Sequence, residues 1–578
     1  MKLAKKVLLL MTACLLVVSL FSFAMSSPSV AAEKSLKASD SKKSKNLIVL
    51  IGDGMGPGQV TLSRLYAQKY EKMDQLYMDN YLVGTNSTFA DVSYDGKSSG
   101  IITDSAASGT AFATGNKTYN GAISVTNEQV AKPVASVIEA AQAEGKGTGI
   151  ISTARLTHAT PAVYASHVRS RGNENAIAAQ FVESDVDVLI GGGEYHFVAD
   201  KKDAEFGRAK REDGRNLVEE FKEKGYTVAS DKESLRNAEG DKLLALLSDS
   251  HVPYELDREE SVPRLNEQLT KAIEVLEKND EGFVLMVEAG RIDHAGHAND
   301  IHSVVRELLE FDEAFATAVE YAKKSGDTTV IATADHETGG LTLGRDNISD
   351  IYYDSFGNVK ASSEKIGSKL EKATSDAEIK AIMKEYAAIE DLTANELAQL
   401  KKANGEKASP SGSDVFNIVI AKRSNIGWTG YGHTAVDVGV YGYGPAAELL
   451  RGFNDNTDFA KAGATALGLN LEKATKNLQE KYAYPIVKKS EVGETLFPAE
   501  DLQGLLGIKV EKNNGSVTVS GDRFSFTMKQ NAEQVQVANR MFEANAQGED
   551  VYIPFELLQL LSNKKITWDG LSERIVME

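Results

Sequence analysis

Residues 47–56 of this chain read LIVLIGDGMG, an apolar run that stops abruptly at a glycine and an acidic residue. Every residue from 47 to 51 is apolar, so the run has no polar face. This pattern is typical of a strand that is buried on both faces of a parallel sheet. Asp53 comes directly after the run, where the strand is expected to end. The stretch therefore predicts a central strand with a carboxylate at its carboxyl end.

Similar short runs recur along the chain, and segments with apolar residues at helical spacing lie between them. The further runs are at 148–153, 186–190, 283–287, 328–333 and 436–441, and the helical patterns are at 133–144, 262–278 and 303–324. Strands that alternate with helices predict an α/β fold, doubly wound, with a mostly parallel central sheet flanked by helices. The stretches 195–260 and 345–425 are rich in charged residues and are expected to be insertions on the rim of this sheet.

The end of the chain has a different pattern. Residues 494–506 (ETLFPAEDLQGLL) resemble residues 550–561 (DVYIPFELLQLL), with a proline in equivalent places. Each copy is followed by a short strand-like stretch. We therefore expect a main domain at 46–485 and a small α+β domain with an internal duplication at 490–578.

The composition fits a soluble globular protein with more than one folding unit. The chain has 578 residues, of which 42% are apolar and 25% are charged, and this length exceeds what one core usually holds. The formal net charge is −19, which argues against a nucleic-acid-binding surface because such a surface needs a basic footprint.

The N-terminus has the pattern of a secretory signal peptide. Lysines precede an apolar run at 7–23, and small residues at 30–32 offer a cleavage site. We expect a signal peptide at 1–32, a flexible leader at 33–45, and a mature protein that is secreted or associated with the cell surface. The one cysteine, Cys14, lies in the predicted signal peptide, so no intramolecular disulfide is expected.

Acidic, hydroxyl and histidine side chains follow the predicted strands or directly precede the last of them. Ligands bind outside the carboxyl ends of strands in open α/β sheets, so these side chains are expected to gather at one edge. A single Asp after a strand is usually a turn residue, but several such positions at the same edge weaken that interpretation. The residues are Asp53, Thr160, Glu288, Asp293, His297, Asp335, His336 and His433.

The ligand types separate these side chains into three sets. The first set has two imidazoles and one carboxylate and suits zinc, whereas the second is more acidic. The third set has hard oxygen donors and suits magnesium. Clustered carboxylates would repel one another strongly without cations. The sets are Asp293, His297 and His433; Asp53, Asp335 and His336; and Asp53, Thr160 and Glu288. The histidines at 167, 196, 251 and 302 are expected to be structural.

A nucleophile is visible at residues 103–111, TDSAASGTA, which are almost all small. Ser105 would lie in the first turn of a helix, where free N–H groups favour an anion. A Ser or Asp at this position is most often a helix cap, and both roles can hold together. Neither a Gly-x-Ser-x-Gly motif nor a histidine-based triad accompanies Ser105, so activation by a metal is the alternative route to a nucleophilic serine.

Six motifs resemble those of alkaline phosphatases, in the family's order, across roughly residues 45–470. They are LIGDGMG, TDSAASGTAFATG, ISTARLTHATPA with SHVRSR, VEAGRIDHAGH, TADHETGG and GYGHTAVDVGVYG. The resemblance implies hydrolysis of phosphate monoesters, with Ser105 as the nucleophile that forms a phosphoserine and Arg171 as the clamp on the phosphate. It also implies two zinc ions in the first two sets, one magnesium ion in the third, and a homodimer.

Two further positions vary within the family. His158 and His294 correspond to Asp and Lys in the familiar enterobacterial enzymes but to His in the animal ones. The resemblance therefore implies that His158 ligates the third metal or lies beside it, which puts pure magnesium occupancy in doubt. Residues 490–578 resemble the small repeat domain named after the copper amine oxidase N-terminus, which implies attachment to the cell wall or surface. No histidine or cysteine follows His433, so no copper site is expected there.

Two alternatives to a phosphomonoesterase are open at this point. A sulfatase or phosphodiesterase of the same superfamily would share the fold, but sulfatases carry a Cys/Ser-x-Pro-x-Arg motif that is absent here, and diesterases usually use Thr and lack the third metal site. A non-catalytic surface protein that binds through its terminal domain would not need the complete ligand set.

Overall fold

The computed structural model describes residues 43–403, 411–546 and 550–578. The predicted signal peptide and nearly all of the predicted leader lie outside these residues. Within the described ranges, no helix combines the length and the apolarity that crossing a membrane requires.

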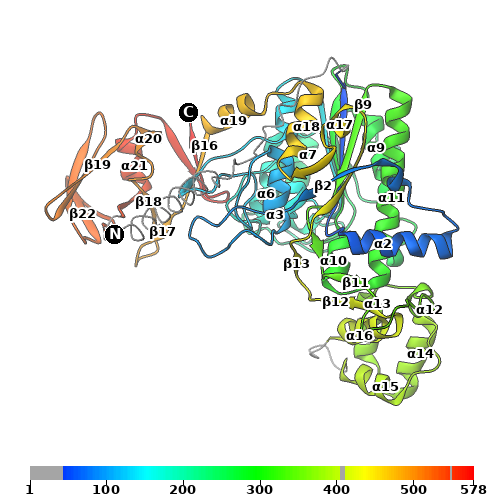
Figure 1. The fold of residues 1–578 in the computed structure, drawn as a ribbon. Coiled ribbons are helices and arrows are strands. Elements are labelled where there is room, and N and C mark those ends of the chain that lie inside the picture. Colours follow the sequence, from blue (N-terminus) through cyan, green and yellow to red (C-terminus); the bar gives the residue numbers. More distant parts are fainter. Residues whose placement is uncertain (1–42, 404–410, 547–549) are drawn as a thin grey trace, which may run out of the picture. The chain divides into compact units, whose positions relative to one another are not determined.

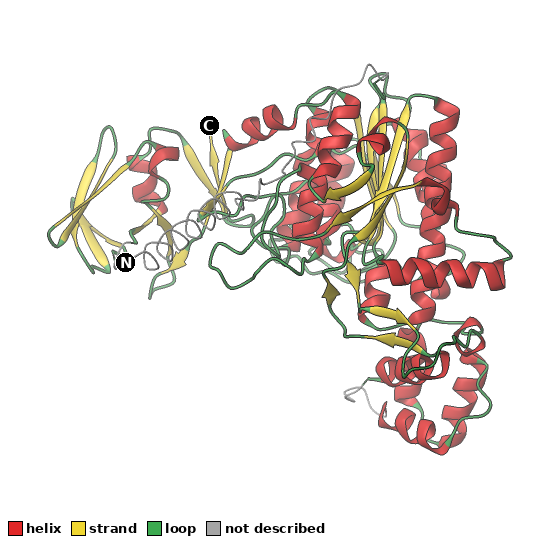
Figure 2. Cartoon of the chain, viewed as in Figure 1, coloured by secondary structure: helices red, strands yellow, loops and turns green. Residues whose placement is uncertain are grey.

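A ten-stranded sheet forms the centre of the protein, and helices cover both of its faces (Figures 1 and 2). β1 (Asn46–Gly52) pairs in parallel with β8 (Phe283–Ala289) on one side and with β9 (Thr328–Thr333) on the other. The other strands are β2 (Leu82–Ser87), β4 (Gly147–Arg155), β5 (Val188–Gly192), β6 (Thr227–Ala229), β7 (Leu243–Leu246), β14 (Val438–Tyr443) and β15 (Gly452–Asp455). Their order is β15-β2-β14-β9-β1-β8-β4-β5-β7-β6. The predicted α/β fold is confirmed.

The apolar sequence of β1 is explained by two hydrophobic cores, one on each face of the sheet. Leu47 belongs to the core that includes Phe112 of α3 (Ser105–Thr114). Ile48, the next residue, belongs to the opposite core, which includes Phe311. Because successive side chains of a strand point to opposite faces, a strand covered on both sides needs apolar residues at every position.

The three predicted helices are present. The longest is α11 (Ile301–Ser325), which begins where the Asp300 carboxylate accepts a hydrogen bond from the Ser303 backbone N–H at 3.1 Å. It ends at Gly326, whose φ of 71° is the left-handed conformation that closes many helices. The other two are α4 (Val137–Gln142) and α9 (Leu265–Leu276).

The direction of β14 differs from the expectation of a parallel strand. It runs antiparallel to both of its neighbours, β9 and β2. A buried apolar run carries no information about strand direction, so the pattern at 436–441 predicted a strand but not its orientation. The reversal places the residues before β14, including His433, at the edge where β1, β8 and β9 end.

Residues 195–260, expected to be an insertion on the rim, supply the last two strands of the central sheet. β7 pairs in parallel with β5, and β6 pairs in parallel with β7 at the edge. Both strands are short and are flanked by charged segments, which hides them in the sequence. The same stretch contains α7 (Leu217–Glu223) and α8 (Lys232–Asn237).

The described residues of 345–425, which we call the helical lobe, fold into short helices around a hydrophobic core that includes Phe356. Tyr66, the last residue of α2 (Pro57–Tyr66), and Val305 of α11 are part of this core, so the lobe packs on the main body. Its helices are α12 (Asp354–Gly357), α13 (Ser363–Lys372), α14 (Asp376–Ala387), α15 (Ala394–Leu400) and α16 (Gly412–Ser424).

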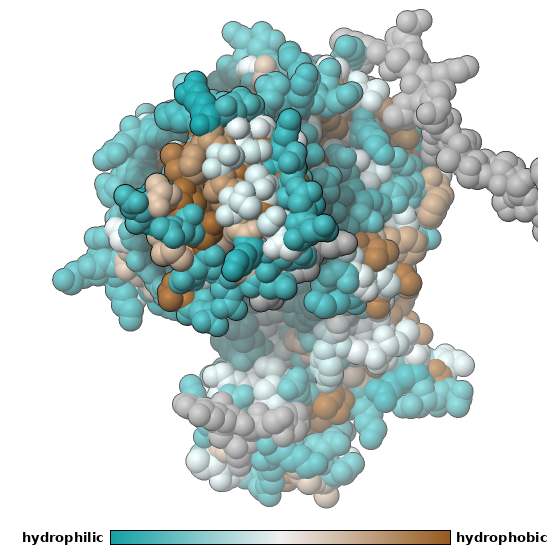
Figure 3. Space-filling model, turned by 90° about the vertical axis from the view of Figure 1, so that its left-hand side faces the viewer, coloured by the Kyte–Doolittle hydropathy of each residue, from teal (hydrophilic) through white to brown (hydrophobic). Residues whose placement is uncertain are grey.

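The two similar C-terminal segments pair with each other. β18 (Thr495–Pro498) lies antiparallel to β24 (Tyr552–Pro554), and Phe497 is opposite Ile553. Each strand precedes a short helix, α20 (Gln503–Leu506) or α21 (Phe555–Leu561), and both copies contribute to one hydrophobic core. Figure 3 views this region end on and shows apolar atoms at its surface, where exposed apolar side chains include Met541.

A small sheet spans the predicted boundary between 485 and 490. The last strand, β26 (Arg574–Met577), pairs with β25 (Ile566–Asp569) on one side and with β16 (Tyr482–Pro485) on the other. β16 in turn pairs with β3 (Val130–Ala131) of the main body. The end of the chain is thus joined to the main body by backbone hydrogen bonds.

Candidate functional site

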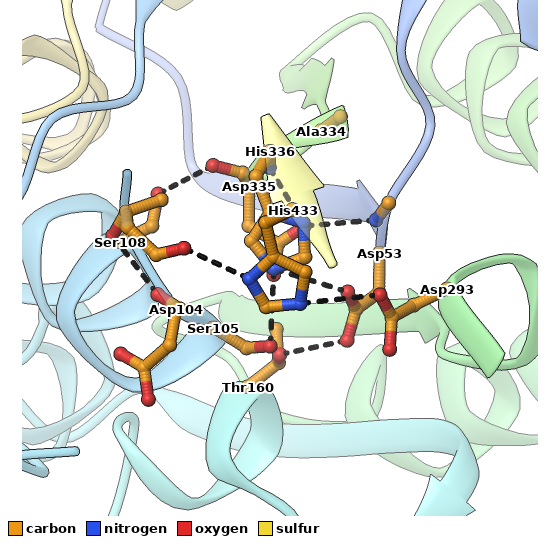
Figure 4. Close-up of polar contacts among 12 residues, drawn as sticks. Asp53, Asp104, Ser105, Ser108, Thr160, Asp293, Ala334, Asp335, His336 and His433 are labelled. Atoms are coloured by element: carbon orange, nitrogen blue, oxygen red, sulfur yellow. Dashed lines mark hydrogen bonds and ion pairs between the residues drawn. The ribbon is translucent and has the colours of Figure 1, made fainter. Parts of the chain in front are cut away.

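The predicted ligand residues come together at the carboxyl edge of the central sheet, where several different elements contribute them; Figure 4 shows Asp53, Thr160, Asp293, Asp335, His336 and His433. Asp53 directly follows β1, Glu288 lies in β8, and Asp335 follows β9. The other positions are on α5 (Ala159–Ala162), α10 (Arg291–His297) and β13 (His433–Thr434). The spatial grouping follows from strand order, but the roles of these residues stay predictions at this point.

The turn after β1 is compressed against the ligand-bearing segments. Gly54 has a φ of 75°, and a Cβ atom there would lie 2.8 Å from the Asp293 Cα atom and 2.8 Å from the Thr338 Oγ1 atom. With no side chain in the way, the Gly54 backbone N–H donates to Asp335 Oδ1 at 3.0 Å. Glycine is therefore required at this position for both conformation and space.

The first group consists of Asp293, His297 and His433. The Nε2 atoms of the two histidines face each other at 3.1 Å, and Asp293 Oδ1 lies 3.3 and 3.5 Å from them. His433 Nδ1 donates to the Thr103 carbonyl at 2.8 Å, and His297 Nδ1 donates to the Tyr431 carbonyl. Since carbonyl oxygens only accept, Nδ1 of each ring carries a proton, and both Nε2 atoms point to the same place.

This arrangement attracts positive charge. Burial lowers the pKa of His297, but the hydrogen bond and charge of Asp293 outweigh burial and raise that pKa to about 9. The Asp293 carboxylate is also oriented by Thr338 Oγ1, which donates to Oδ1 at 2.6 Å. Two opposed imidazole nitrogens and a fixed carboxylate oxygen fit a zinc ion by ligand type.

The second group consists of Asp53, Asp335 and His336, all fully buried. One ligand atom of each lies within 4.8 Å of the others. Burial and the charges of neighbouring acids raise the pKa of Asp53 well above its usual value and that of Asp335 to about 6. Among the residues that the structure describes, Asp53 Oδ1 and Asp335 Oδ2 have no hydrogen-bond partner. Buried oxygens without partners are costly unless a cation satisfies them, so this group also fits a metal ion.

The third group contains the predicted Asp53, Thr160 and Glu288, and His158 joins it. Ligand atoms of Asp53, His158 and Glu288 lie within 4.8 Å of one another, and Thr160 Oγ1 donates to Asp53 Oδ2 at 3.4 Å. Ser152 donates a hydrogen bond to one Glu288 oxygen, while the other oxygen is buried and has no hydrogen-bond partner in the described part of the chain. Burial raises the pKa of Glu288 to about 7. The oxygen donors fit magnesium, and the imidazole adds a softer ligand.

Ser105 lies beside the second group, at the start of α3. Its Oγ is 3.3 Å from His336 Nε2, and the side chain is 1% exposed. Asp104 caps the helix by accepting a hydrogen bond from the Ala107 N–H at 3.0 Å, and the same oxygen accepts from the Gly121 N–H, outside the helix, at 3.1 Å. One turn later, Ser108 Oγ donates to the Asp335 carbonyl at 2.8 Å, which fixes the helix against the ligand segment.

Arg171 approaches the same place from the other side. One terminal nitrogen donates to Asp104 Oδ2 at 3.0 Å and the other donates to His158 Nε2 at 3.1 Å. Sequence reasoning considered Asp104 only as a possible cap and missed its contact with Arg171. The signal was its position next to Ser105, where a carboxylate can serve both groups.

His251, expected to be structural, lies in a cluster with His158 and His294. Its ring centroid is 4.1 Å from that of His294 and 5.7 Å from that of His158. The Arg155 side chain connects His251 to Glu174, whose carboxylate accepts two bonds from the guanidinium at 2.7 and 2.9 Å. The sequence did not place His251 near the third group because this residue lies in the charged stretch 195–260, which was expected to be a peripheral insertion; its structural role stays a prediction.

The other three histidines interact away from the metal-ligand groups. His167 lies between the Ser124 carbonyl and Glu139, and His196 bonds to Asn175. His302 is buried with its ring edge against Tyr66.

Comparisons with known proteins identify one family. The family model described as alkaline phosphatase matches residues 44–469. Alkaline phosphatase 3 of Bacillus subtilis is 36% identical over 474 residues, which cover 80% of this chain and 98% of that protein. The crystal structure of the cold-active alkaline phosphatase from Shewanella sp. has 35% identity and a TM-score of 0.65, covering 73% of this chain and 99% of that one.

A metal ion is named for one of the more distant structures. The alkaline phosphatase of the Antarctic bacterium TAB5, as a His 135 Glu mutant with Mg bound in the M3 site, has 27% identity and a TM-score of 0.53. It covers 74% of this chain and 99% of that one. The family match spans more than two thirds of the chain and includes every residue of the three groups, and we conclude that this protein belongs to the alkaline phosphatase family, whose members are metal-dependent enzymes that hydrolyse phosphate monoesters.

Proposed function

We propose that this chain is a secreted phosphomonoesterase that releases inorganic phosphate through a phosphoserine at Ser105, at a site for two zinc ions and one magnesium ion. The observation that carries the proposal is the position of Ser105 Oγ, 3.3 Å from His336 Nε2, at the start of a helix. It lies beside buried carboxylates with oxygens that have no hydrogen-bond partner among the described residues. The residues thus combine a nucleophile, an anion site and places for cations.

The residues that would hold the metals are those of the three groups. By ligand type, the first and second groups suit zinc and the third suits magnesium. The TAB5 relative, as a His 135 Glu mutant, binds magnesium in a site called M3. When bound, the cations would lower the pKa of the Ser105 hydroxyl and stabilise charge on the attacking and leaving oxygens. His158 adds an imidazole to the third group, so a zinc ion can compete for that place.

The protein residues bind and orient the phosphoryl group. Ser105 is the first residue of α3, where free backbone N–H groups favour a bound anion. The Arg171 guanidinium, held in place by Asp104 and His158, can bind two phosphoryl oxygens through its planar fork. Ser105 Oγ forms the new bond to phosphorus as the ester bond breaks and the alcohol departs, and water then hydrolyses the phosphoserine to regenerate the hydroxyl.

Export and association are further parts of the proposal. The lysines before the apolar run at 7–23 support secretion, and the domain at 490–578 is a candidate for attachment to the cell wall or surface. A homodimer is proposed from the family resemblance alone.

Trapping of the phosphoserine tests the mechanism. The metal-loaded enzyme is incubated with labelled inorganic phosphate at acidic pH, quenched and digested, and the labelled peptide is sequenced. We expect the label on Ser105, loss of the label in Ser105→Ala, and retention in Ser108→Ala, a matched serine one turn further along α3. Ser105→Ala should also lose turnover by orders of magnitude while its metal content and melting temperature are kept. A label on any other residue would contradict the assignment.

A further inference from the structure

The backbone and the side chain of Arg171 are both tied to the start of α3. The Arg171 N–H donates to the Gly121 carbonyl at 2.7 Å, and the Gly121 N–H donates to Asp104 Oδ1 at 3.1 Å. The other Asp104 oxygen accepts from the Arg171 guanidinium at 3.0 Å. These three hydrogen bonds form a closed ring directly next to Ser105. A shift of the backbone at Arg171 would therefore disturb both the guanidinium and the carboxylate that orients it.

The segment that carries Arg171 has no helix or strand of its own. It follows Val168, which forms an isolated bridge with Ile123, and it ends where α6 (Glu174–Ser184) begins. Residues 169–173, between these two points, form turns and bends. The ladder bonds of a strand or helix therefore do not fix the position of Arg171. That position depends on contacts with neighbouring parts of the chain.

Contacts with one small sheet lie on both sides of Arg171. Two residues before it, the Arg169 guanidinium donates to the Tyr484 carbonyl of β16 at 3.0 Å. Two residues after it, the Asn173 side-chain amide donates to the Leu571 carbonyl at 2.8 Å. Leu571 lies between β25 and β26, and β26 pairs with β16, so both contacts reach the same sheet. Each contact is made at most about 7 Å along the chain from Arg171.

Asn173 has a position at which its side chain would normally cap α6. It is the residue before the first turn, where asparagine is favoured because its side-chain oxygen can accept from a helix N–H. The Asn173 side chain makes no such capping bond, and its amide is directed to Leu571 instead. Capping of the helix therefore does not explain this side chain.

The turn that presents the Leu571 carbonyl is itself held in place. Asp569 Oδ1 accepts from the N–H groups of Leu571 at 3.1 Å and Ser572 at 3.2 Å. Asp569 Oδ2 accepts from Arg574 Nε at 3.0 Å. The Leu571 side chain packs against the main hydrophobic core that includes Phe112. Asn173 is thus bonded to an ordered turn that is anchored on the main body.

We propose that the terminal hairpin, which is β25 and β26 with the turn between them, positions Arg171 for phosphate through the hydrogen bond between Asn173 and Leu571. Asn173 is a positioning residue, because it acts through the backbone of Arg171. The inference rests on the proposed function, since it takes Arg171 as the residue that binds phosphate. It gives the end of the chain, which carries no predicted ligand, a part in substrate binding.

The substitution Asn173→Ser tests this contact. Serine is too short to keep the bond to Leu571, but it is neutral and caps helices as well as asparagine does, so the melting temperature should be kept. We expect the inhibition constant of inorganic phosphate and the KM of p-nitrophenyl phosphate to rise about three- to tenfold, as for the loss of one hydrogen bond. Turnover at saturating substrate should change less, because a displaced Arg171 weakens binding of the ground state and the transition state alike.

A double-mutant cycle separates positioning from general damage. In an Arg171→Ala background, Asn173→Ser should not raise the inhibition constant of phosphate further, since no guanidinium remains to be displaced. Glu183→Ala is the matched control, because it removes the ion pair with Arg574 at the other end of α6. This variant should melt at a lower temperature and keep the phosphate inhibition of the unmodified enzyme.

Two results would overturn the positioning role of Asn173. One is an unchanged inhibition constant in Asn173→Ser, and the other is an equal rise with and without Arg171. A different result, unchanged phosphate inhibition in Arg171→Ala itself, would overturn the role of Arg171 in the proposed function. The two failures are therefore distinguishable.

Discussion

At the scale of single residues, Asp104 connects the start of a helix to the binding of phosphate. One carboxylate oxygen accepts from two backbone N–H groups and the other accepts from Arg171. A helix cap needs only a hydrogen-bond acceptor, which Asn also provides. A full negative charge, in contrast, strengthens the hydrogen bond that holds the Arg171 guanidinium in place for the phosphate.

Asp104→Asn therefore separates the two roles. The cap is kept, so the melting temperature should change little, while the inhibition constant of inorganic phosphate should rise about tenfold because a charge-assisted bond to Arg171 is weakened. Inhibition assays and thermal denaturation check this. Asp104→Ala serves as the control, because it loses the cap as well and should also lower stability by about 1 kcal/mol. Unchanged phosphate inhibition in Asp104→Asn would show that Arg171 is held by other contacts.

The third group depends on individual histidines in a similar way. The ring centroids of His158 and His294 lie 5.5 Å apart, and His158 is close enough to Asp53 and Glu288 to share a cation with them. Replacing both, as His158→Asp with His294→Lys, exchanges an imidazole for a hard oxygen donor and adds a fixed positive charge.

We expect this double variant to bind magnesium more tightly at the third group, within the 10–100-fold range typical for changes around a metal site, and to shift its pH profile. Metal content after dialysis against magnesium and zinc, together with activity with and without added magnesium, measures the change. His302→Gln, a buried histidine outside the cluster, is the control. An unaltered metal response would place both histidines outside the site.

At the scale of elements, His167 connects α4 to the chain around Ser124. Its two ring nitrogens face the Ser124 carbonyl and Glu139 Oε1, each at 2.8 Å. Both neighbours are acceptors, so the doubly protonated ring satisfies both. Burial lowers the pKa of His167, but the charge and hydrogen bond of Glu139 outweigh burial and raise it above its usual value.

This raised pKa makes the contribution of His167 to stability depend on pH. A histidine that binds its proton more tightly in the folded state stabilises fully below its unfolded pKa of about 6.5, and the contribution is lost as pH rises through the folded pKa. The melting temperature should therefore differ more between the unmodified enzyme and His167→Gln at pH 6 than at pH 9. In His196→Gln the trend should be reversed, because burial lowers the pKa of His196. A difference for His167→Gln that does not depend on pH would contradict the charged pair.

The elements also show what the sequence can and cannot predict. The strand at 47–51 was predictable because a strand covered on both faces needs apolar residues throughout, and Asp53 was predictable because carboxyl ends share an edge. The direction of β14 was not, since apolarity does not encode orientation. The contacts of His251 come from tertiary packing and leave no pattern in the local sequence. The contact between Asp104 and Arg171 was missed although the position of Asp104 next to Ser105 was a signal for it.

At the scale of the whole molecule, the site exists only when the central sheet is complete. Its ligands extend from Asp53 to His433, and four buried carboxylates, those of Asp53, Glu288, Asp293 and Asp335, are brought close together. Their mutual repulsion opposes folding unless cations are bound. Metal binding and folding are therefore expected to be coupled.

Chelation tests this coupling. Treatment with a chelator should lower the melting temperature and abolish activity, and added zinc with magnesium should restore both. Asp335→Asn removes one of the four charges, so chelation should lower the melting temperature of this variant by less than it lowers that of the unmodified enzyme. If chelation leaves the melting temperature of the unmodified enzyme unchanged, the carboxylates are neutralised by protons instead of metals.

The C-terminal region, residues 490–578, carries no predicted ligand, but a sheet joins it to the main body. β26 covers β16, and Arg574 forms an ion pair with Glu183 at 2.7 Å. Loss of these contacts would uncover Tyr484, which is fully buried. Truncation near Gly493 should therefore reduce stability without moving the ligands, all of which lie before it.

We expect the truncated enzyme to keep turnover largely intact at moderate temperature, to melt at a lower temperature, and to lose binding to cell-wall preparations. Arg574→Ala is the matched control, since it weakens the junction while the rest of the C-terminal region stays in place, and it should lower the melting temperature without affecting wall binding. Turnover, thermal denaturation and sedimentation with cell walls measure the three properties separately. Collapse of activity at a temperature where the truncated protein is still folded would show that the C-terminal region supports the site itself. The boundary near residue 490 would then lie within the catalytic unit.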